Sequence, residues 1–197
     1  MSAITLASLS SSRAAMLRAS GVAFEVAPSC VDEAVLKTRL LGAGRGPGEI
    51  AAALADEKAL AVSRQRDGLV VGADQTLDLS GALMDKAEDL LAVRRHLELL
   101  RGRAHVLHAA VALSRRGEVL WRCLSSPVIH VRAFSAAWLD DYISGQGESL
   151  LDSAGCYHLE GAGAQMMERI EGDFFAVLGL PLIELLGALR AHGALSE

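Results

Sequence analysis

The start of the chain alternates between apolar runs and a segment suited to helix. Residues 3–7 are apolar and predict a buried strand, which runs into a serine-rich turn. A helix is expected to start near Ser12, since serine is a good N-cap, and to end at Gly21. Apolar residues then alternate with smaller or polar ones over 22–26, which predicts a second strand.

The middle of the chain continues this alternation. The glycine-rich stretch 42–48 predicts a loop, and an alanine-rich helix is expected over 50–63. The apolar run 69–73 predicts a strand that leads directly to Asp74. Leucine and valine residues on one helical stripe predict a helix over 88–100.

The second half of the chain is richer in strands. Ser135 and Gly145 are start and stop signals for one helix, and Pro181 suits the first turn of another. The expected elements are strands over 106–113, 118–123, 128–133 and 165–170, and helices over 134–143 and 181–189. The pattern predicts an α/β protein with a mixed, twisted sheet and flanking helices. A chain of 197 residues suits a single domain over 1–197.

Composition narrows the class of protein. Apolar residues make up 51% of the chain and aromatic residues 4%, so the core must be aliphatic, and it is large enough to fold without disulfides. A net charge of −5 argues against binding to nucleic-acid polymers or anionic membranes. The three cysteines form no CxxC pair, which favours a reducing cytoplasm. We find no signal-peptide pattern and no apolar stretch of membrane-spanning length.

A first candidate site lies over residues 8–13, Ser-Leu-Ser-Ser-Ser-Arg, between an expected strand and an expected helix. Backbone N–H groups, hydroxyl groups and a guanidinium group gathered at a helix N-terminus can bind phosphate. An ordinary serine-rich turn with a solvated Arg13 fits the same residues, so both interpretations stay open.

A second candidate is Asp74, which directly follows an apolar strand. Such a carboxylate can hold a divalent ion or activate water, although an aspartate that caps a turn is an equal alternative. Lys86 supplies a cation for phosphate oxygens, or a surface charge. The chain has three lysines, Lys37, Lys58 and Lys86, against sixteen arginines. Where arginine is so strongly preferred, a lysine is expected to serve as a compact point charge.

Acidic and glycine-rich segments provide weaker candidates. Asp32 and Glu33 form a carboxylate pair in an expected loop, suited to a metal or water ligand or to simple solvation. Glycines over 154–163 allow close approach of a flat ligand, and Glu160 can accept hydrogen bonds from a purine edge. Neither this segment nor 42–48 matches a dinucleotide fingerprint or a P-loop.

The histidines show no metal-ligand spacing. His105 and His108 are three residues apart in an expected strand, which places them on opposite faces of the sheet. We interpret both as structural.

Taken in order, motifs across nearly the whole chain resemble the Maf nucleotide pyrophosphatases. Each motif alone is weak, whereas their order and spacing together are specific. The residues that carry the resemblance are Leu6-Ala7-Ser8-x-Ser10-x-x-Arg13, Val31-Asp32-Glu33, Glu57-Lys58-Ala59, Gly72-Ala73-Asp74-Gln75, Lys86, Leu100-x-Gly102-x-x-His105, Ala154-Gly155, Glu160-Gly161-x-Gly163, Glu168-Arg169-Ile170-Glu171-Gly172-Asp173 and Val177-x-Gly179-Leu180-Pro181-Leu182.

The resemblance implies two lobes around a central nucleotide-binding cleft, as in inosine triphosphate pyrophosphatases, and often a homodimer. It implies hydrolysis of a nucleoside triphosphate to the monophosphate and pyrophosphate, with Mg or Mn as the divalent metal cation. By this likeness Asp74 is the catalytic or metal-linked carboxylate, and Glu33 assists the metal or the water. The residues implied to bind the triphosphate are Ser8, Ser10, Arg13, Lys58 and Lys86.

Three positions bear on substrate specificity within the family. Gln75 and Glu160 resemble the branch associated with 7-methyl-GTP, and differ from members that act on dTTP and UTP. Methylation makes guanine cationic, and a carboxylate can pair with its N1–H and 2-amino edge. Ser12, together with Ala14 and Ala87, departs from the family pattern and leaves the exact substrate open.

Two other functions stay open at this point. Maf relatives are also linked to inhibition of septum formation, so the chain fits a nucleotide-binding regulator of cell division that needs no chemistry at Asp74. An unrelated α/β phosphatase would instead use Asp74 as a nucleophile and release orthophosphate.

Overall fold

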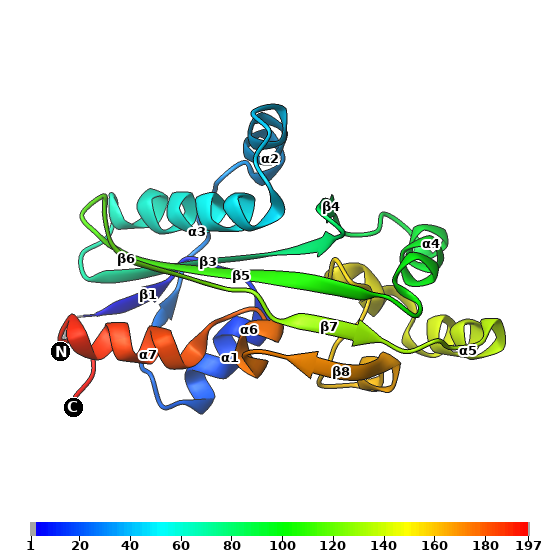
Figure 1. Ribbon diagram of the computed structural model, residues 1–197. Coiled ribbons are helices and arrows are strands. Elements are labelled where there is room, and N and C mark those ends of the chain that lie inside the picture. Colours follow the sequence, from blue (N-terminus) through cyan, green and yellow to red (C-terminus); the bar gives the residue numbers. More distant parts are fainter. Residues whose placement is uncertain (1–2, 197) are drawn as a thin grey trace.

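Strands and helices alternate along the chain in a computed structural model that describes residues 3–196 (Figure 1). The strands are β1 (Ile4–Leu6), β2 (Glu25–Val26), β3 (Leu69–Leu79), β4 (Ala82–Met84), β5 (Ala104–Arg115), β6 (Glu118–Ser125), β7 (Val128–Val131) and β8 (Met167–Glu171). The α-helices are α1 (Ser11–Ala19), α2 (Glu33–Gly42), α3 (Pro47–Ser63), α4 (Leu90–Leu100), α5 (Ala136–Gln146), α6 (Phe174–Val177) and α7 (Leu182–Ala191). Two short 3-10 helices, η1 (Gly147–Asp152) and η2 (Ala162–Met166), follow α5.

All of these strands belong to one sheet. Its main path runs β2-β1-β3-β5-β7-β8, while β4 pairs with β3 and β6 pairs with β5. Strand β1 is parallel to β2 and β3, and the other pairs are antiparallel. The predicted α/β class with a mixed sheet is therefore confirmed.

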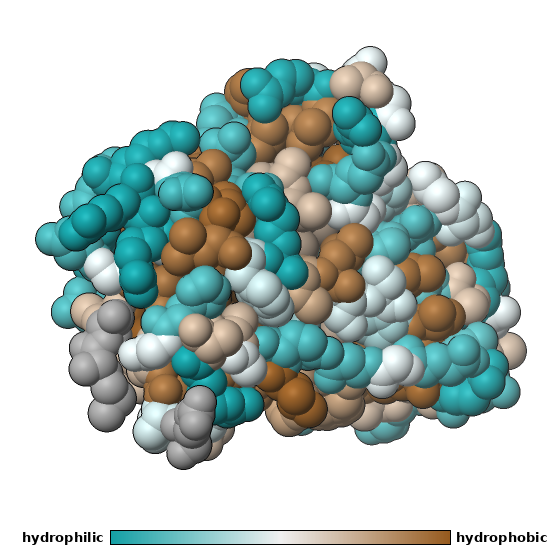
Figure 2. Space-filling model, turned by 60° about the vertical axis from the view of Figure 1, so that its left-hand side comes forward, coloured by the Kyte–Doolittle hydropathy of each residue, from teal (hydrophilic) through white to brown (hydrophobic). Residues whose placement is uncertain are grey.

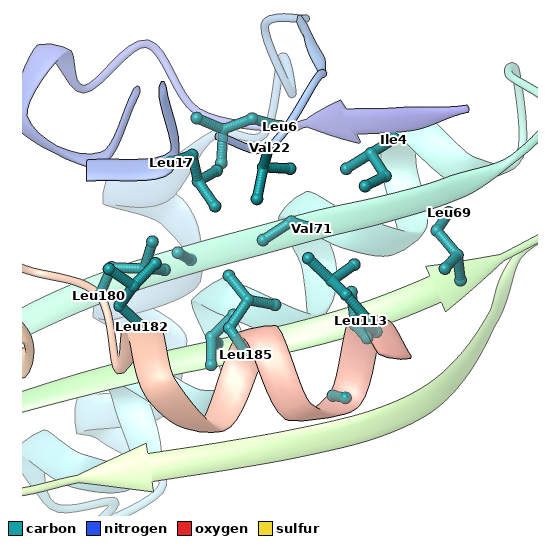
Figure 3. Close-up of a cluster of buried hydrophobic side chains, with 14 of the residues drawn as sticks. Ile4, Leu6, Leu17, Val22, Leu69, Val71, Leu113, Leu180, Leu182 and Leu185 are labelled. Carbon is teal, nitrogen blue, oxygen red and sulfur yellow. The ribbon is translucent and has the colours of Figure 1, made fainter. Parts of the chain in front are cut away.

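Helices cover both faces of the central strands β3 and β5. Helix α3 lies along one face, and α1 and α7 lie on the other (Figure 1). Alternate side chains of the two strands face opposite layers. Figure 3 shows one layer, in which Leu182 and Leu185 of α7 pack toward Val71 and Leu113.

A second buried cluster lies at the other end of the same strands. Leu77 and Leu107 pack there with Leu97 of α4, Ile129 of β7 and Leu139 of α5. Two apolar clusters thus share one long sheet, which gives the two lobes that the family resemblance implies.

Helix α3 lies unusually close to β3, and Gly72 permits this approach. A Cβ atom at position 72 would lie 2.2 Å from the carbonyl oxygen of Ala55 and 2.5 Å from the backbone nitrogen of Ala59. Only glycine fits against the alanine side of this helix. Lys58 lies between Ala55 and Ala59 in the sequence. The close packing of α3 therefore sets the distance of Lys58 from the strand.

Strand β3 is longer than predicted. The sequence places its end at residue 73, whereas the structure continues it to Leu79, so Asp74 lies in mid-strand. Pairing with β5 runs from Val70 to Asp78 and holds the polar segment extended. The propensity of Asp74 and its polar neighbours for a turn is overridden by this long antiparallel partner.

The interpretation of Asp32 and Glu33 as a loop pair is wrong. Asp32 is the N-cap of α2, where its carboxylate accepts a hydrogen bond from the backbone of Val35, and Glu33 is the first residue of the helix. Acidic residues at these positions stabilise the N-terminus of a helix. The sequence pattern does not predict helix α2, because Leu36 is its only buried residue and the helix has almost no apolar stripe.

Smaller differences concern element ends. The N-cap of α1 is Ser10 instead of Ser12, because Ser10 has the extended backbone that a cap requires. Strand β2 is limited to two residues, and Val22 packs into the core outside it. Within residues 3–196 no helix is long and apolar enough to cross a membrane.

Candidate active site

A cleft of about 1030 Å³ opens beside the uncovered part of β3. Strand β1 pairs with β3 only as far as Val71, and β4 begins to pair at Leu77. Between them this edge of β3 has no strand partner, and Asp74 lies in that interval. All ten residues assigned to the site from the sequence line this one cleft: Ser8, Ser10, Ser12, Arg13, Glu33, Lys58, Asp74, Gln75, Lys86 and Glu160.

The N-terminus of α1 forms one wall of the cleft. Ser10 caps the helix, and its hydroxyl accepts a hydrogen bond from the backbone N–H of Arg13 at 3.4 Å. Ser11 and Ser12, the first two residues of the helix, also line the cleft. Their backbone N–H groups are among those that an α-helix leaves unpaired, and the helix dipole favours an anion there.

Arg13 joins this wall to two distant segments. Its Nε donates to the carbonyl oxygen of Gly179 at 2.9 Å, and its Nη1 donates to Ala73 at 3.1 Å and to the Ser8 hydroxyl at 3.2 Å. Burial lowers the pKa of the Arg13 guanidinium, while the charges of Asp74 and Glu33 act in the opposite direction. Arginine stays protonated in proteins, so Nη2 remains available as a charged donor to a ligand.

Asp74, Lys58 and Glu33 form the charged centre of the cleft. The Lys58 ammonium group contacts Oδ1 of Asp74 at 2.6 Å and Oε1 of Glu33 at 2.7 Å. Asp74 and Lys58 are buried, with 8% and 7% of their side chains exposed, whereas 45% of Glu33 is exposed. The second Asp74 oxygen, Oδ2, has no hydrogen-bond partner among residues 3–196, so it is open to a water or an ion.

All three lysines of the chain line the cleft. Lys86 is exposed and has no ion pair within the described part of the chain. Lys37, on α2, contacts Asp85 at 2.7 Å, next to Lys86. Lys37 is not among the residues assigned to the site from the sequence. The rarity of lysine, which favours a functional role for Lys58 and Lys86, applies to Lys37 as well.

The two main candidates for substrate specificity, Gln75 and Glu160, line the cleft from different segments of the chain. Gln75 points to the opposite face of β3 from Asp74, and its amide nitrogen donates to the carbonyl oxygens of Ala176 at 2.7 Å and Val177 at 3.2 Å. Only its carbonyl oxygen remains for a ligand. Glu160 is exposed and lines the same cleft.

Two glycines of the 154–163 segment, Gly155 and Gly163, are required by packing within the segment. A Cβ atom at Gly155 would lie 2.3 Å from the Tyr157 ring, and one at Gly163 would lie 2.6 Å from the carbonyl oxygen of His158. The Tyr157 hydroxyl in turn lies 2.7 Å from Nε2 of His105. The structural role predicted for His105 therefore includes holding the wall of the cleft.

The pKa of His105 makes stability depend on pH. Burial lowers this pKa to about 4 from its ordinary value of 6.5, and the charge of His130 acts in the same direction. Between these values the unfolded chain binds more protons than the folded one, so the free energy of unfolding falls as pH falls from 6.5 toward 4. We expect His105 to contribute a loss of about 3 kcal/mol across this window.

Urea unfolding measured at several pH values in that window tests the effect. His105→Asn, which cannot titrate, is expected to have a flatter pH profile than the wild type, even though it is less stable at neutral pH. Parallel profiles for the two proteins would contradict the assignment to His105.

Glu33 and Asp74 are the residues suited to a divalent cation. Within residues 3–196 no group of three or more His, Cys, Asp or Glu side chains could hold a metal ion. Mg²⁺, however, commonly binds to one or two carboxylates together with substrate phosphates and water. The oxygens of Glu33 and Asp74 contact one ammonium nitrogen, so they are close enough to serve one ion. The donor set fits a metal that is bound jointly with a nucleotide.

Comparison with known proteins assigns the chain to a family. The Maf family, described as Maf-like protein, matches residues 3–192, and the chain belongs to this family. A relative from Caulobacter vibrioides, named nucleoside triphosphate pyrophosphatase, is 53% identical over 98% of this chain and 97% of its own length. A relative of the same name from Granulibacter bethesdensis is 45% identical over 98% of both chains. A Rhizobium meliloti relative named 7-methyl-GTP pyrophosphatase is 42% identical over 98% of this chain and 97% of its own length.

Proposed function

We propose that this protein is a nucleoside triphosphate pyrophosphatase that hydrolyses 7-methyl-GTP to 7-methyl-GMP and pyrophosphate with a divalent metal ion. Membership of the Maf family and the names of full-length relatives support the hydrolase class. One observation carries the assignment to this cleft. The buried carboxylate of Asp74 contacts Lys58 in the same cleft into which the N-terminus of α1 opens.

The arrangement suits attack of water on the α-phosphorus. The free Oδ2 of Asp74 can orient the water and accept its proton, because Lys58 holds the carboxylate in place through Oδ1. The charge that develops on the phosphate oxygens is stabilised by Arg13, Lys86 and the N–H groups at the start of α1. Pyrophosphate then leaves toward the same cationic groups.

The charge of the cleft supports a metal. Its described lining contains four Lys and Arg and five Asp and Glu side chains, which cannot by themselves neutralise a triphosphate. Glu33 and Asp74 would hold a Mg or Mn ion together with the nucleotide. When bound, the ion neutralises charge on the phosphate oxygens and polarises the phosphorus toward attack.

Specificity for 7-methyl-GTP rests on Glu160. Its carboxylate is expected to pair with the N1–H and 2-amino group of the cationic base, while Gln75 offers one carbonyl oxygen. Charge-assisted hydrogen bonds contribute about 1.5–3 kcal/mol. Because Glu160 is exposed, we expect Glu160→Gln to lower the preference for 7-methyl-GTP over GTP by about tenfold, near the lower limit of that range.

The matched control is Asp152→Asn, which removes a carboxylate from another exposed position of the cleft lining. Ratios of kcat/KM for the two nucleotides should change in the first variant and stay constant in the second. An unchanged ratio in Glu160→Gln would remove Glu160 from the specificity assignment.

The function as a whole is tested by a substrate panel. The wild-type protein is incubated with Mg²⁺ or Mn²⁺ and 7-methyl-GTP, GTP, dTTP, UTP or CTP, and pyrophosphate and orthophosphate are measured separately. Preferential release of pyrophosphate from 7-methyl-GTP is the expected result. A preference for dTTP or UTP would keep the enzyme class and exclude this specificity, whereas orthophosphate as the first product would exclude the class.

We also propose that the enzyme works in a reducing cytoplasm and forms a homodimer. Cys30, Cys123 and Cys156 are all free thiols, which supports a reducing cytoplasm. The likeness to the Maf family supports a homodimer, and analytical ultracentrifugation at several protein concentrations tests it.

A further inference from the structure

Lys58 has a position in the cleft that the proposed catalytic chemistry does not by itself explain. It is held over β3 by the close packing of α3 on Gly72, and only 7% of its side chain is exposed. Its ammonium group lies between two carboxylates, 2.6 Å from Asp74 and 2.7 Å from Glu33. A residue that only bound phosphate would be expected to face the open cleft, as Lys86 does.

The two carboxylates are also the only candidates for the metal in the described part of the cleft centre. The cation and the ammonium group therefore compete for the same oxygens. Two cations that share the same carboxylate oxygens repel each other, so the ammonium group opposes the binding of a metal ion there. While Lys58 stays in place, it offsets one of the two negative charges and occupies an oxygen of each carboxylate, so Glu33 and Asp74 bind a free divalent ion weakly.

We propose that Lys58 reserves the metal position until a nucleotide brings the ion. This inference rests on the proposed function. When a metal–nucleotide complex enters, the ion takes over the carboxylates and the ammonium group turns on its flexible four-carbon stem to the phosphate oxygens. The exchange keeps a cation next to Asp74 throughout, and it prevents the free enzyme from holding a metal without substrate.

The test is the binding of Mn²⁺ alone, without nucleotide, followed by electron paramagnetic resonance. Wild-type protein is expected to bind Mn²⁺ weakly, and Lys58→Met at least about tenfold more tightly, because the competing ammonium group is gone. Lys58→Met is expected to lose turnover at the same time. The gain should disappear in the double variant Lys58→Met with Asp74→Asn.

Lys37→Met is the matched control. It removes the same charge from the same cleft and also leaves a former partner, Asp85, without its lysine, but that partner is a single carboxylate. We expect no gain in Mn²⁺ affinity. If Lys58→Met does not fold, Lys58→Gln replaces it, since its amide can still donate a hydrogen bond to Asp74.

Three results would overturn the inference. They are tight Mn²⁺ binding by the wild type without nucleotide, no gain in a folded Lys58 variant, and an equal gain in Lys37→Met. None of these results depends on turnover, so failure here is separate from failure of the substrate panel, which uses only the wild-type enzyme.

Discussion

Replacement of Asp74 by asparagine should lower the rate of pyrophosphate release by about 10²- to 10⁴-fold, the usual contribution of a general base. Asparagine keeps the shape of the side chain and an oxygen that can accept from Lys58, but it cannot accept a proton from water or hold a metal ion as strongly. Lys58 keeps its contact with Glu33, so the variant is expected to fold. The measurement is kcat for 7-methyl-GTP at saturating substrate and metal.

Asp78→Asn is the matched control for this substitution. Asp78 lies on the same strand and the same face as Asp74, four residues further on, but it contacts His108 and not the cleft. Its replacement is expected to leave kcat near the wild-type value. Turnover that survives in Asp74→Asn at near the wild-type rate would exclude this carboxylate as the general base.

The composition of the site could be predicted from the sequence, because its residues occur as short motifs in a fixed order. Ser8 and Arg13 share one segment, Lys58 and Asp74 come from two others, and all four residues line one cleft. That prediction came from the family resemblance, which depends on the order of the motifs along the chain. Nothing in the local pattern of any one segment indicated that the others were close to it.

Contacts within the site could not be predicted, since they depend on the packing of distant segments. Gln75 was assigned to base recognition, yet its amide nitrogen is engaged by carbonyl groups about a hundred residues further along the chain. Lys58 and Asp74 are close only because α3 packs tightly on β3. Lys37 lies on a helix with a single buried residue, so the apolar pattern did not predict the element that carries it.

Replacement of Gly72 by alanine should disrupt both the fold and the active site. The added methyl group would lie 2.2 Å from the Ala55 carbonyl oxygen and 2.7 Å from the Ala59 side chain, so α3 must move away from β3. Overpacking of this kind costs about 3 kcal/mol, at the upper end of the usual range, and lowers the melting temperature by about 6–12 °C for a chain of this size.

The same displacement moves Lys58 relative to Asp74, because α3 carries one of them and β3 the other. A misplacement of about 1 Å can lower a reaction rate by about 10²-fold, so kcat should fall by this order in molecules that remain folded. Gly187→Ala provides the control: Gly187 lies in α7 with no atom within 4 Å of the added Cβ, and alanine should stabilise the helix by about 0.5–1 kcal/mol. Calorimetry and activity at a temperature well below both transitions separate the two effects. Wild-type stability and turnover in Gly72→Ala would show that the contact between α3 and β3 is not what sets the geometry of Lys58 and Asp74.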